Sequence, residues 1–237
     1  MAPTLVREPF HRSAWIYEEK VDGWRIVAYK DRDSVRLVSR TGVDHSRRFR
    51  DIAAAIAKLS ARTLVLDGEI AIFDEELRSR FDWLREPDRA AVASPPVYMA
   101  FDLLYRDGRE LIARPLAYRR VRLEGVVAGS ELVFPVRRLT PDGLAAWQQV
   151  IERGYEGYVA KDEACAYEGG PTKRWLKVKQ KDSTASTPSS SSTDSAVISM
   201  VARQTSARGS RALHMARGSS GRSRRRGCGD ARHARNG

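Results

Sequence analysis

The segment from Glu18 to Arg25, with the sequence EEKVDGWR, brings a lysine, an arginine and three carboxylates together. A lysine amine is a nucleophile only when unprotonated, and its ordinary pKa of about 10.4 keeps it charged at neutral pH. Burial or neighbouring cations lower that pKa. We expect Lys20 to close one strand, Gly23 to permit a tight turn and Arg25 to open the next strand. The guanidinium could then grip a phosphate while the amine attacks it. The alternative interpretation is a surface hairpin with a Lys–Asp pair.

Two further segments place charged side chains at or within expected strands. Ser39-Arg40-Thr41-Gly42 puts a second arginine before a turn glycine, and Leu66-Asp67-Gly68-Glu69 interrupts an apolar run with two carboxylates. Glu69 is a candidate to bind a ribose hydroxyl or a metal ion. Seen alone, Asp67-Gly68 could also be a hairpin turn.

Three segments later in the chain add an aromatic ring and more charge. Phe101 opens FDLL, where it is either a core side chain or a platform on which a base stacks. Glu156 and Lys161 stand at the two ends of EGYVAK, where a helix ends and a strand begins. Lys177 and Lys179 alternate in WLKVK and therefore share one strand face. Two ammonium groups on one face repel unless water screens them or an anion lies between them, and an oligophosphate would serve.

The elements that must position these residues are mostly short strands. Alternating or β-rich runs predict strands at residues 15–19, 25–29, 35–39, 64–73, 97–104, 132–136 and 158–161. Helical patterns occur at 49–59, 116–126 and 142–153, and Asp107-Gly108 predicts a hairpin. The strands cluster as hairpins with isolated helices between them. This arrangement predicts an α+β domain of antiparallel sheets flanked by helices.

Composition divides the 237-residue chain near Lys181-Asp182. Residues 1–182 can bury a single core, whereas residues 183–237 contain no Phe, Tyr or Trp and are dominated by Ser, Arg, Gly and Ala. The latter composition predicts a disordered basic tail. Ten arginines and two aspartates in the tail account for +8 of the net charge of +12. The tail either binds a polyanion or is a solvated end without function, so net charge alone does not indicate a nucleic-acid partner.

Cysteine usage and the start of the chain bear on the compartment. Cys165 and Cys228 lie on opposite sides of that boundary and form neither a disulfide framework nor a CxxC metal pattern. A signal peptide needs an apolar run where this chain has Arg7, Glu8, His11 and Arg12, and no stretch approaches a membrane span. We therefore expect a reduced, cytoplasmic location without a membrane partner.

Six of these segments, in this order and at these spacings, resemble the motifs of the covalent nucleotidyltransferase superfamily. That superfamily comprises ATP-dependent DNA ligases, RNA ligases and mRNA-capping enzymes. KVDGWR looks like motif I, SRTG like the segment after it, LDGE like motif III, FDLLY like motif IIIa, EGYVAK like motif IV and WLKVK like motif V. The resemblance runs from about Trp15 to Lys179. FDLLY and WLKVK look most like compact bacterial DNA ligases. The resemblance implies a ligase-type nucleotidyltransferase fold, which is ATP-grasp-like, in residues 1–182.

The resemblance also implies a chemical role for each motif residue. Lys20 would attack the α-phosphate of ATP and carry AMP, which then passes to a 5′-phosphate at a nick in duplex DNA, where a 3′-hydroxyl releases it. Glu18 would read the adenine amino group and Phe101 would stack on the adenine. The remaining residues would bind sugar, phosphate or Mg²⁺ (or Mn²⁺): Arg25, Arg40 and Glu69 the ribose and phosphates, Lys161, Lys177 and Lys179 the phosphate charge, and Glu156 with Glu69 the metal.

The sequence departs from the family after motif V. Family DNA ligases continue there into an OB-fold domain, which residues 183–237 cannot form without aromatic side chains. We expect an adenylation domain alone, with impaired nick sealing and either a natural or a frame-altered end. Three hypotheses follow: a monomeric DNA ligase (ATP) catalytic domain serving DNA repair, recombination and replication; an RNA ligase or capping-type nucleotidyltransferase; and a non-catalytic, nucleic-acid-binding remnant.

Overall fold

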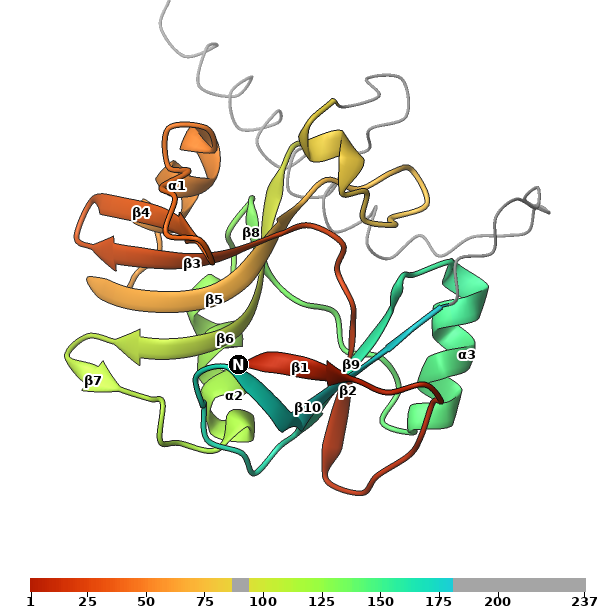
Figure 1. The fold of residues 1–237 in the computed structure, drawn as a ribbon. Helices are drawn as coiled ribbons and strands as arrows, with labels where there is room; N and C mark the ends of the chain where they lie inside the picture. The colour runs from red at the N-terminus through yellow and green to blue at the C-terminus, as the bar shows by residue number, and fades with distance from the viewer. Residues whose placement is uncertain (87–93, 181–237) are drawn as a thin grey trace, which may run out of the picture. The chain divides into compact units, whose positions relative to one another are not determined.

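The computed structural model describes residues 1–86 and 94–180, which all lie within one unit of the chain. The expected tail at 183–237 and Cys228 lie outside the described residues. The described part contains two sheets and three α-helices (Figure 1). None of the helices in these ranges is long and apolar enough to cross a membrane.

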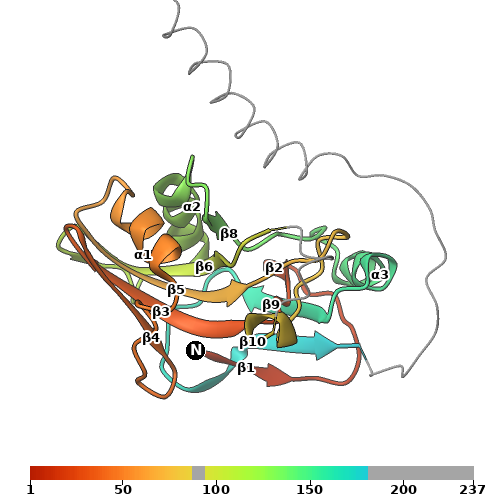
Figure 2. The same ribbon diagram turned by 90° about the horizontal axis from the view of Figure 1, so that it is seen from above.

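The larger sheet is covered on one face by helices (Figure 2). Ile52 of α1 (Arg50–Ala57) and Leu123 of α2 (Leu116–Val127) pack with Ile26 and Leu66 of the strands into one apolar cluster. A short 3₁₀ helix, η1 (Asp82–Leu84), follows the strand β5. In sheet order the strands are β4 (Ser34–Ser39), β3 (Trp24–Asp31), β5 (Thr63–Ala71), β6 (Val97–Arg106) and β7 (Arg109–Glu110). A further strand, β8 (Val133–Pro135), also pairs with β6.

The smaller sheet has the order β1-β10-β9-β2 and is covered by α3 (Gly143–Arg153). Asp142 caps α3 because its carboxylate accepts hydrogen bonds from two backbone N–H groups of the first turn, at 3.0 and 2.8 Å. Tyr17 and Tyr158 of the sheet pack with Val150 of the helix. The strands are β1 (Ala2–Leu5), β10 (Pro171–Lys179), β9 (Gly157–Asp162) and β2 (Trp15–Glu19).

The chain crosses from one sheet to the other immediately after Lys20. β2 belongs to the smaller sheet and β3 to the larger one, so the alternative of a surface hairpin around Lys20 is wrong. The reason for Gly23 also differs from the expected tight turn. A Cβ atom at Gly23 would lie 2.2 Å from the carbonyl oxygen of Ile70, so only glycine lets this crossing pass so close to β5.

The predicted α+β class is confirmed, and so is the hairpin at Asp107-Gly108, whose φ angles of 47° and 82° suit its tight turn. Most strand pairs are antiparallel, as expected, but β1 pairs in parallel with β10 and β8 in parallel with β6, so both sheets are mixed. β1 was not predicted. The alternative of a turn at Asp67-Gly68 is also wrong, because both residues lie inside β5 and pair with neighbouring strands on each side.

Candidate active site

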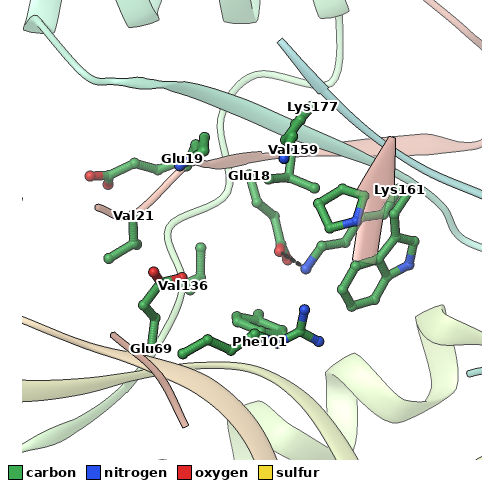
Figure 3. A pocket seen from close by; sticks show the side chains of 13 residues that line it. Glu18, Glu19, Val21, Glu69, Phe101, Val136, Val159, Lys161 and Lys177 are labelled. Atoms are coloured by element: carbon green, nitrogen blue, oxygen red, sulfur yellow. Dashed lines mark hydrogen bonds and ion pairs between the residues drawn. The ribbon is translucent and has the colours of Figure 1, made fainter. Parts of the chain in front are cut away.

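A pocket lies between the two sheets and is lined from both of them (Figure 3). β2, β9 and β10 of the smaller sheet and β3, β5 and β6 of the larger sheet all contribute side chains. The alternation of side chains along each strand decides which residues face it. Seven predicted site residues line this pocket: Glu18, Lys20, Arg25, Glu69, Phe101, Lys161 and Lys177.

Glu156 joins Lys20 to Lys179. One carboxylate oxygen of Glu156 accepts a hydrogen bond from the Lys20 Nζ, and the other lies 2.6 Å from the Lys179 Nζ. Lys20 and Glu156 are 136 residues apart in the chain, and β9, which begins directly after Glu156, pairs with β2, which ends directly before Lys20. The pairing of these strands therefore fixes the position of the lysine amine at the pocket wall.

Glu18 lies at the buried end of the pocket between two cations. Its Oε2 accepts a hydrogen bond from the Lys161 Nζ, and Figure 3 shows these two side chains pointing toward one another. Its Oε1 lies 3.0 Å from the Arg120 Nε. The pair is not aligned for a hydrogen bond, so Oε1 keeps a free acceptor lone pair. A buried acceptor with free capacity suits an N–H donor of a bound base.

Two aromatic rings form the apolar wall beside Glu18. Phe101 of β6 and Trp175 of β10 meet edge to face with ring centroids 5.8 Å apart. The Lys161 Nζ lies 4.7 Å from the Phe101 centroid, and the Arg25 guanidinium lies 5.3 Å from it on the larger-sheet side. Burial lowers the pKa of Lys161. Rings and cations together suit a planar, electron-rich ligand attached to phosphates.

Glu69 lies near Lys20 and binds the segment that crosses between the sheets. Its Oε1 accepts a hydrogen bond from the Gly23 N–H at 3.1 Å. Burial raises the pKa of Glu69 to about 8, and the charge of Glu156 adds to that rise, whereas Lys20 opposes it. The buried position therefore favours the neutral form of this carboxyl group.

These two glutamates bear on whether the site suits a metal ion. No group of three or more His, Cys, Asp or Glu side chains within residues 1–86 and 94–180 could hold an ion. Mg²⁺, however, commonly takes one or two carboxylates and completes its shell with water and substrate phosphates. Glu69 and Glu156, whose charges influence one another, would supply the two carboxylates for such an ion, and a bound cation would favour the ionised form of Glu69.

Lys177 and Arg40 differ in their relation to the pocket. Lys177 lines it, and its pKa is lowered by burial and by the ammonium groups of Lys179 and Lys20. Arg40 is exposed in the turn after β4 and does not line the pocket. The structure thus gathers all the predicted site residues around one pocket except Arg40.

The buried arginines of α2 were not predicted from the sequence. Arg119 and Arg120 alternate with Leu116 and Leu123 at a helical spacing of three and four residues, on the buried face of the helix. Arg120 contacts Glu18 and donates to the carbonyl oxygens of Ala100 and Val136. The sequence held a signal for these arginines, because both occupy positions that helical periodicity assigns to the core. A charged residue at such a position needs a buried partner.

Glu19 gives a pH-dependent prediction about stability. Its carboxylate lies on the opposite side of β2 from Glu18, is 3% exposed, and has Arg137 Nη1 at 3.5 Å from Oε2. Burial raises the pKa of Glu19 to about 7 from 4.5. Because the pKa of Glu19 is raised in the folded state, its carboxyl group contributes fully to the free energy of unfolding below pH 4.5. That contribution is lost as the pH rises through 7 and the buried group ionises. The difference in unfolding free energy between Glu19→Gln and wild type should therefore grow by about 3 kcal/mol in favour of the variant as the pH rises from 5 to 8.

Urea unfolding of both proteins across this pH range measures the difference. Glu152→Gln, at an exposed position of α3, is the matched control and should follow the wild-type curve. Parallel curves for Glu19→Gln and wild type would contradict the prediction.

Solved structures identify the class of protein. The crystal structure of the ligase domain from M. tuberculosis LigD matches with a TM-score of 0.63 and 30% sequence identity, covering 76% of this chain and 59% of that one. A mycobacterial DNA ligase D complexed with ATP and MES matches with a TM-score of 0.61 and 28% identity, covering 75% and 60%. The described fold is therefore that of a ligase nucleotidyltransferase domain.

The sequence comparisons give the family. The model of the ATP dependent DNA ligase domain matches residues 4–179, and the chain belongs to this family. The multifunctional non-homologous end joining protein LigD of Pseudomonas aeruginosa is 32% identical over 74% of this chain, and a probable DNA ligase of Streptomyces griseus is 36% identical over 68%. The chain spans only 21% and 35% of the lengths of these two relatives.

Proposed function

We propose that this domain takes AMP from ATP onto Lys20 and transfers it to the 5′-phosphate of a nick in duplex DNA. The observation that carries the proposal is the position of the Lys20 amine at the wall of a pocket that also holds a free buried acceptor, two aromatic rings and three further cations. The family of the chain and the ATP complex of a related ligase support the same ligand.

Binding of ATP follows from the two ends of the pocket. At the closed end, Glu18 accepts a hydrogen bond from the adenine amino group, and Phe101 packs against the base. Guanine has a carbonyl oxygen at that position, which the carboxylate repels. Toward the open end, Arg25 and Lys177 bind the ribose-phosphate portion, Lys179 reaches it from the strand end, and Lys161 adds positive charge from its place beside Glu18. Arg40, which is exposed, contacts the nucleotide only if its turn moves toward the pocket.

The chemical step occurs at Lys20. After Nζ loses a proton, it attacks the α-phosphorus, a nitrogen–phosphorus bond forms, and the bond from that phosphorus to pyrophosphate oxygen breaks. The surrounding cations stabilise the charge on the transferring phosphate. Glu69 and Glu156 would hold magnesium, which supplies further charge neutralisation when it is bound. In the second step an oxygen of the DNA 5′-phosphate attacks the same phosphorus and frees Lys20, and a 3′-hydroxyl then displaces AMP.

The proposal extends to the biological setting. Relatives of this chain are named for non-homologous end joining, which supports a role in repairing DNA breaks. We propose the same role here, acting as a monomer in the cytoplasm, and extend it to nicks left by recombination and replication. Residues 1–182 form the adenylation domain in this proposal, and residues 183–237 a separate basic tail.

The test is labelling of the full chain with ATP that carries its label on the α-phosphorus. We expect labelled protein with ATP and Mg²⁺, little with GTP, and none after the metal is removed with EDTA. Addition of nicked DNA should then move the label onto the 5′ end of the nick. Preferential labelling by GTP would indicate a capping-type enzyme, and transfer only to nicked RNA an RNA ligase. Nucleic-acid binding without any labelling would indicate a non-catalytic remnant.

A further inference from the structure

Tyr167 lies outside the motif segments, in the loop between β9 and β10, yet it contacts the network behind the pocket. Its hydroxyl donates a hydrogen bond to the Asp67 Oδ2 at 2.8 Å. Asp67 is fully buried in β5 and accepts two hydrogen bonds from Arg25, from Nε at 3.1 Å and from Nη2 at 2.6 Å. A chain of three side chains thus runs from this loop to a cation at the pocket wall.

The Tyr167 ring is itself held in place. Its backbone N–H donates to the Ile112 carbonyl oxygen at 2.8 Å, and its ring meets Trp175 edge to face with centroids 6.3 Å apart. The Arg119 guanidinium lies 6.0 Å from the ring centroid. Burial and the charge of Asp67 raise the pKa of Tyr167, so the hydroxyl keeps the proton that it donates. The tyrosine is therefore a fixed donor.

The third hydrogen bond decides how the Asp67 carboxylate is oriented. The terminal torsion of an aspartate is soft, and a carboxylate with a single partner can rotate about it. The Tyr167 hydroxyl fixes the carboxylate plane, and the two parallel bonds to Arg25 then fix the guanidinium plane. The remaining edge of the guanidinium is left for the pocket, where its central carbon lies 5.3 Å from the Phe101 ring centroid.

We propose that Tyr167 is a positioning residue, whose hydroxyl orients Arg25 through Asp67 and thereby sets the affinity of the pocket for ATP. This inference rests on the proposed function, in which Arg25 binds the nucleotide. Without the hydroxyl, Arg25 keeps its charge and its contact with Asp67 but samples several orientations. The loss therefore falls on nucleotide binding rather than on the reactivity of Lys20.

The experiment measures lysyl-AMP formation by the full chain at a series of ATP concentrations. Tyr167→Phe should raise the KM for ATP about ten-fold, as expected when a hydrogen bond to a charged group is lost, and leave kcat nearly unchanged. Tyr29→Phe, at an exposed position on the same strand as Arg25, is the matched control and should behave as wild type. Thermal unfolding of each variant establishes that it is folded.

A double-substitution cycle separates positioning from a general structural effect. In an Arg25→Lys background, Tyr167→Phe should change the KM by less than about two-fold, because no forked guanidinium remains to be oriented. Asp67→Asn, which also weakens the hold on Arg25, should raise the KM as Tyr167→Phe does. A normal KM in Tyr167→Phe beside an impaired Arg25→Lys would overturn the inference. The inference would also be overturned if Tyr167→Phe raised the KM in the Arg25→Lys background as much as it does in the wild type. Absence of any adduct in the wild type would instead overturn the proposed function and the inference with it.

Discussion

Substitution of Lys20 by arginine is expected to abolish covalent attachment of AMP. Arginine retains the positive charge and can still pair with Glu156, but its guanidinium stays protonated at all working pH values and offers no lone pair for attack. The expected result is complete loss of the AMP mass increase after incubation with ATP and Mg²⁺. ATP itself should still bind, because the groups that contact base and phosphates remain.

Lys173→Arg is the control for this experiment. Lys173 is an exposed lysine on β10, the strand that carries Lys177 and Lys179, and it does not line the pocket. It should form the adduct at the wild-type rate. Peptide mapping of the wild-type adduct should place AMP on Lys20. An adduct on another lysine, or adduct formation by Lys20→Arg, would refute the assignment of the nucleophile.

The second large effect concerns stability. Arg119 and Asp102 form a two-bonded ion pair at 2.7 and 2.8 Å, and both side chains are fully buried. Arg119→Met removes one partner and leaves an uncompensated buried carboxylate. Removal of one member of such a pair costs about 3–5 kcal/mol. We therefore expect the urea midpoint of unfolding to fall markedly at neutral pH, with the slope of the transition unchanged.

A second substitution tests the cause of that loss. Asp102→Asn added to Arg119→Met removes the buried charge, and it should restore about half of the lost free energy. Recovery is incomplete because Arg119 also donates to the carbonyl oxygens of Arg114 and Cys165, which stay without this donor. Arg122→Met, at an exposed position of the same helix, should change stability by less than about 0.5 kcal/mol. No gain from Asp102→Asn would argue that packing, rather than charge, controls the loss.

Some features of the site were predicted from local sequence. The residue types around Lys20 define the available chemistry, because only a few side chains can act as a nucleophile or grip a phosphate. Alternation along WLKVK correctly placed Lys177 and Lys179 on one strand face, and Lys177 lines the pocket. Most strands and all three α-helices of the described part were also predicted, since their apolar periodicity is a local property.

Other features depend on contacts between residues far apart in the chain. The approach of Glu156 to Lys20 requires β9 to pair with β2 across 136 residues, and no local pattern specifies that pairing. The hydrogen bond from Tyr167 to Asp67 spans 100 residues. β1 was missed for the same reason, because it is held by a parallel partner near the end of the described chain.

The sequence alone therefore determined which chemistry its residue types allow and on which elements most of them lie, because residue type and periodicity are local. The tertiary structure alone decided that the chain changes sheets after Lys20, that Glu18 lies between Lys161 and Arg120, and that Arg40 stays exposed outside the pocket. The physical reason is that burial and ion pairing depend on which distant strands and helices meet. In this protein the site is formed where two sheets face each other, so its geometry arises only when both have assembled.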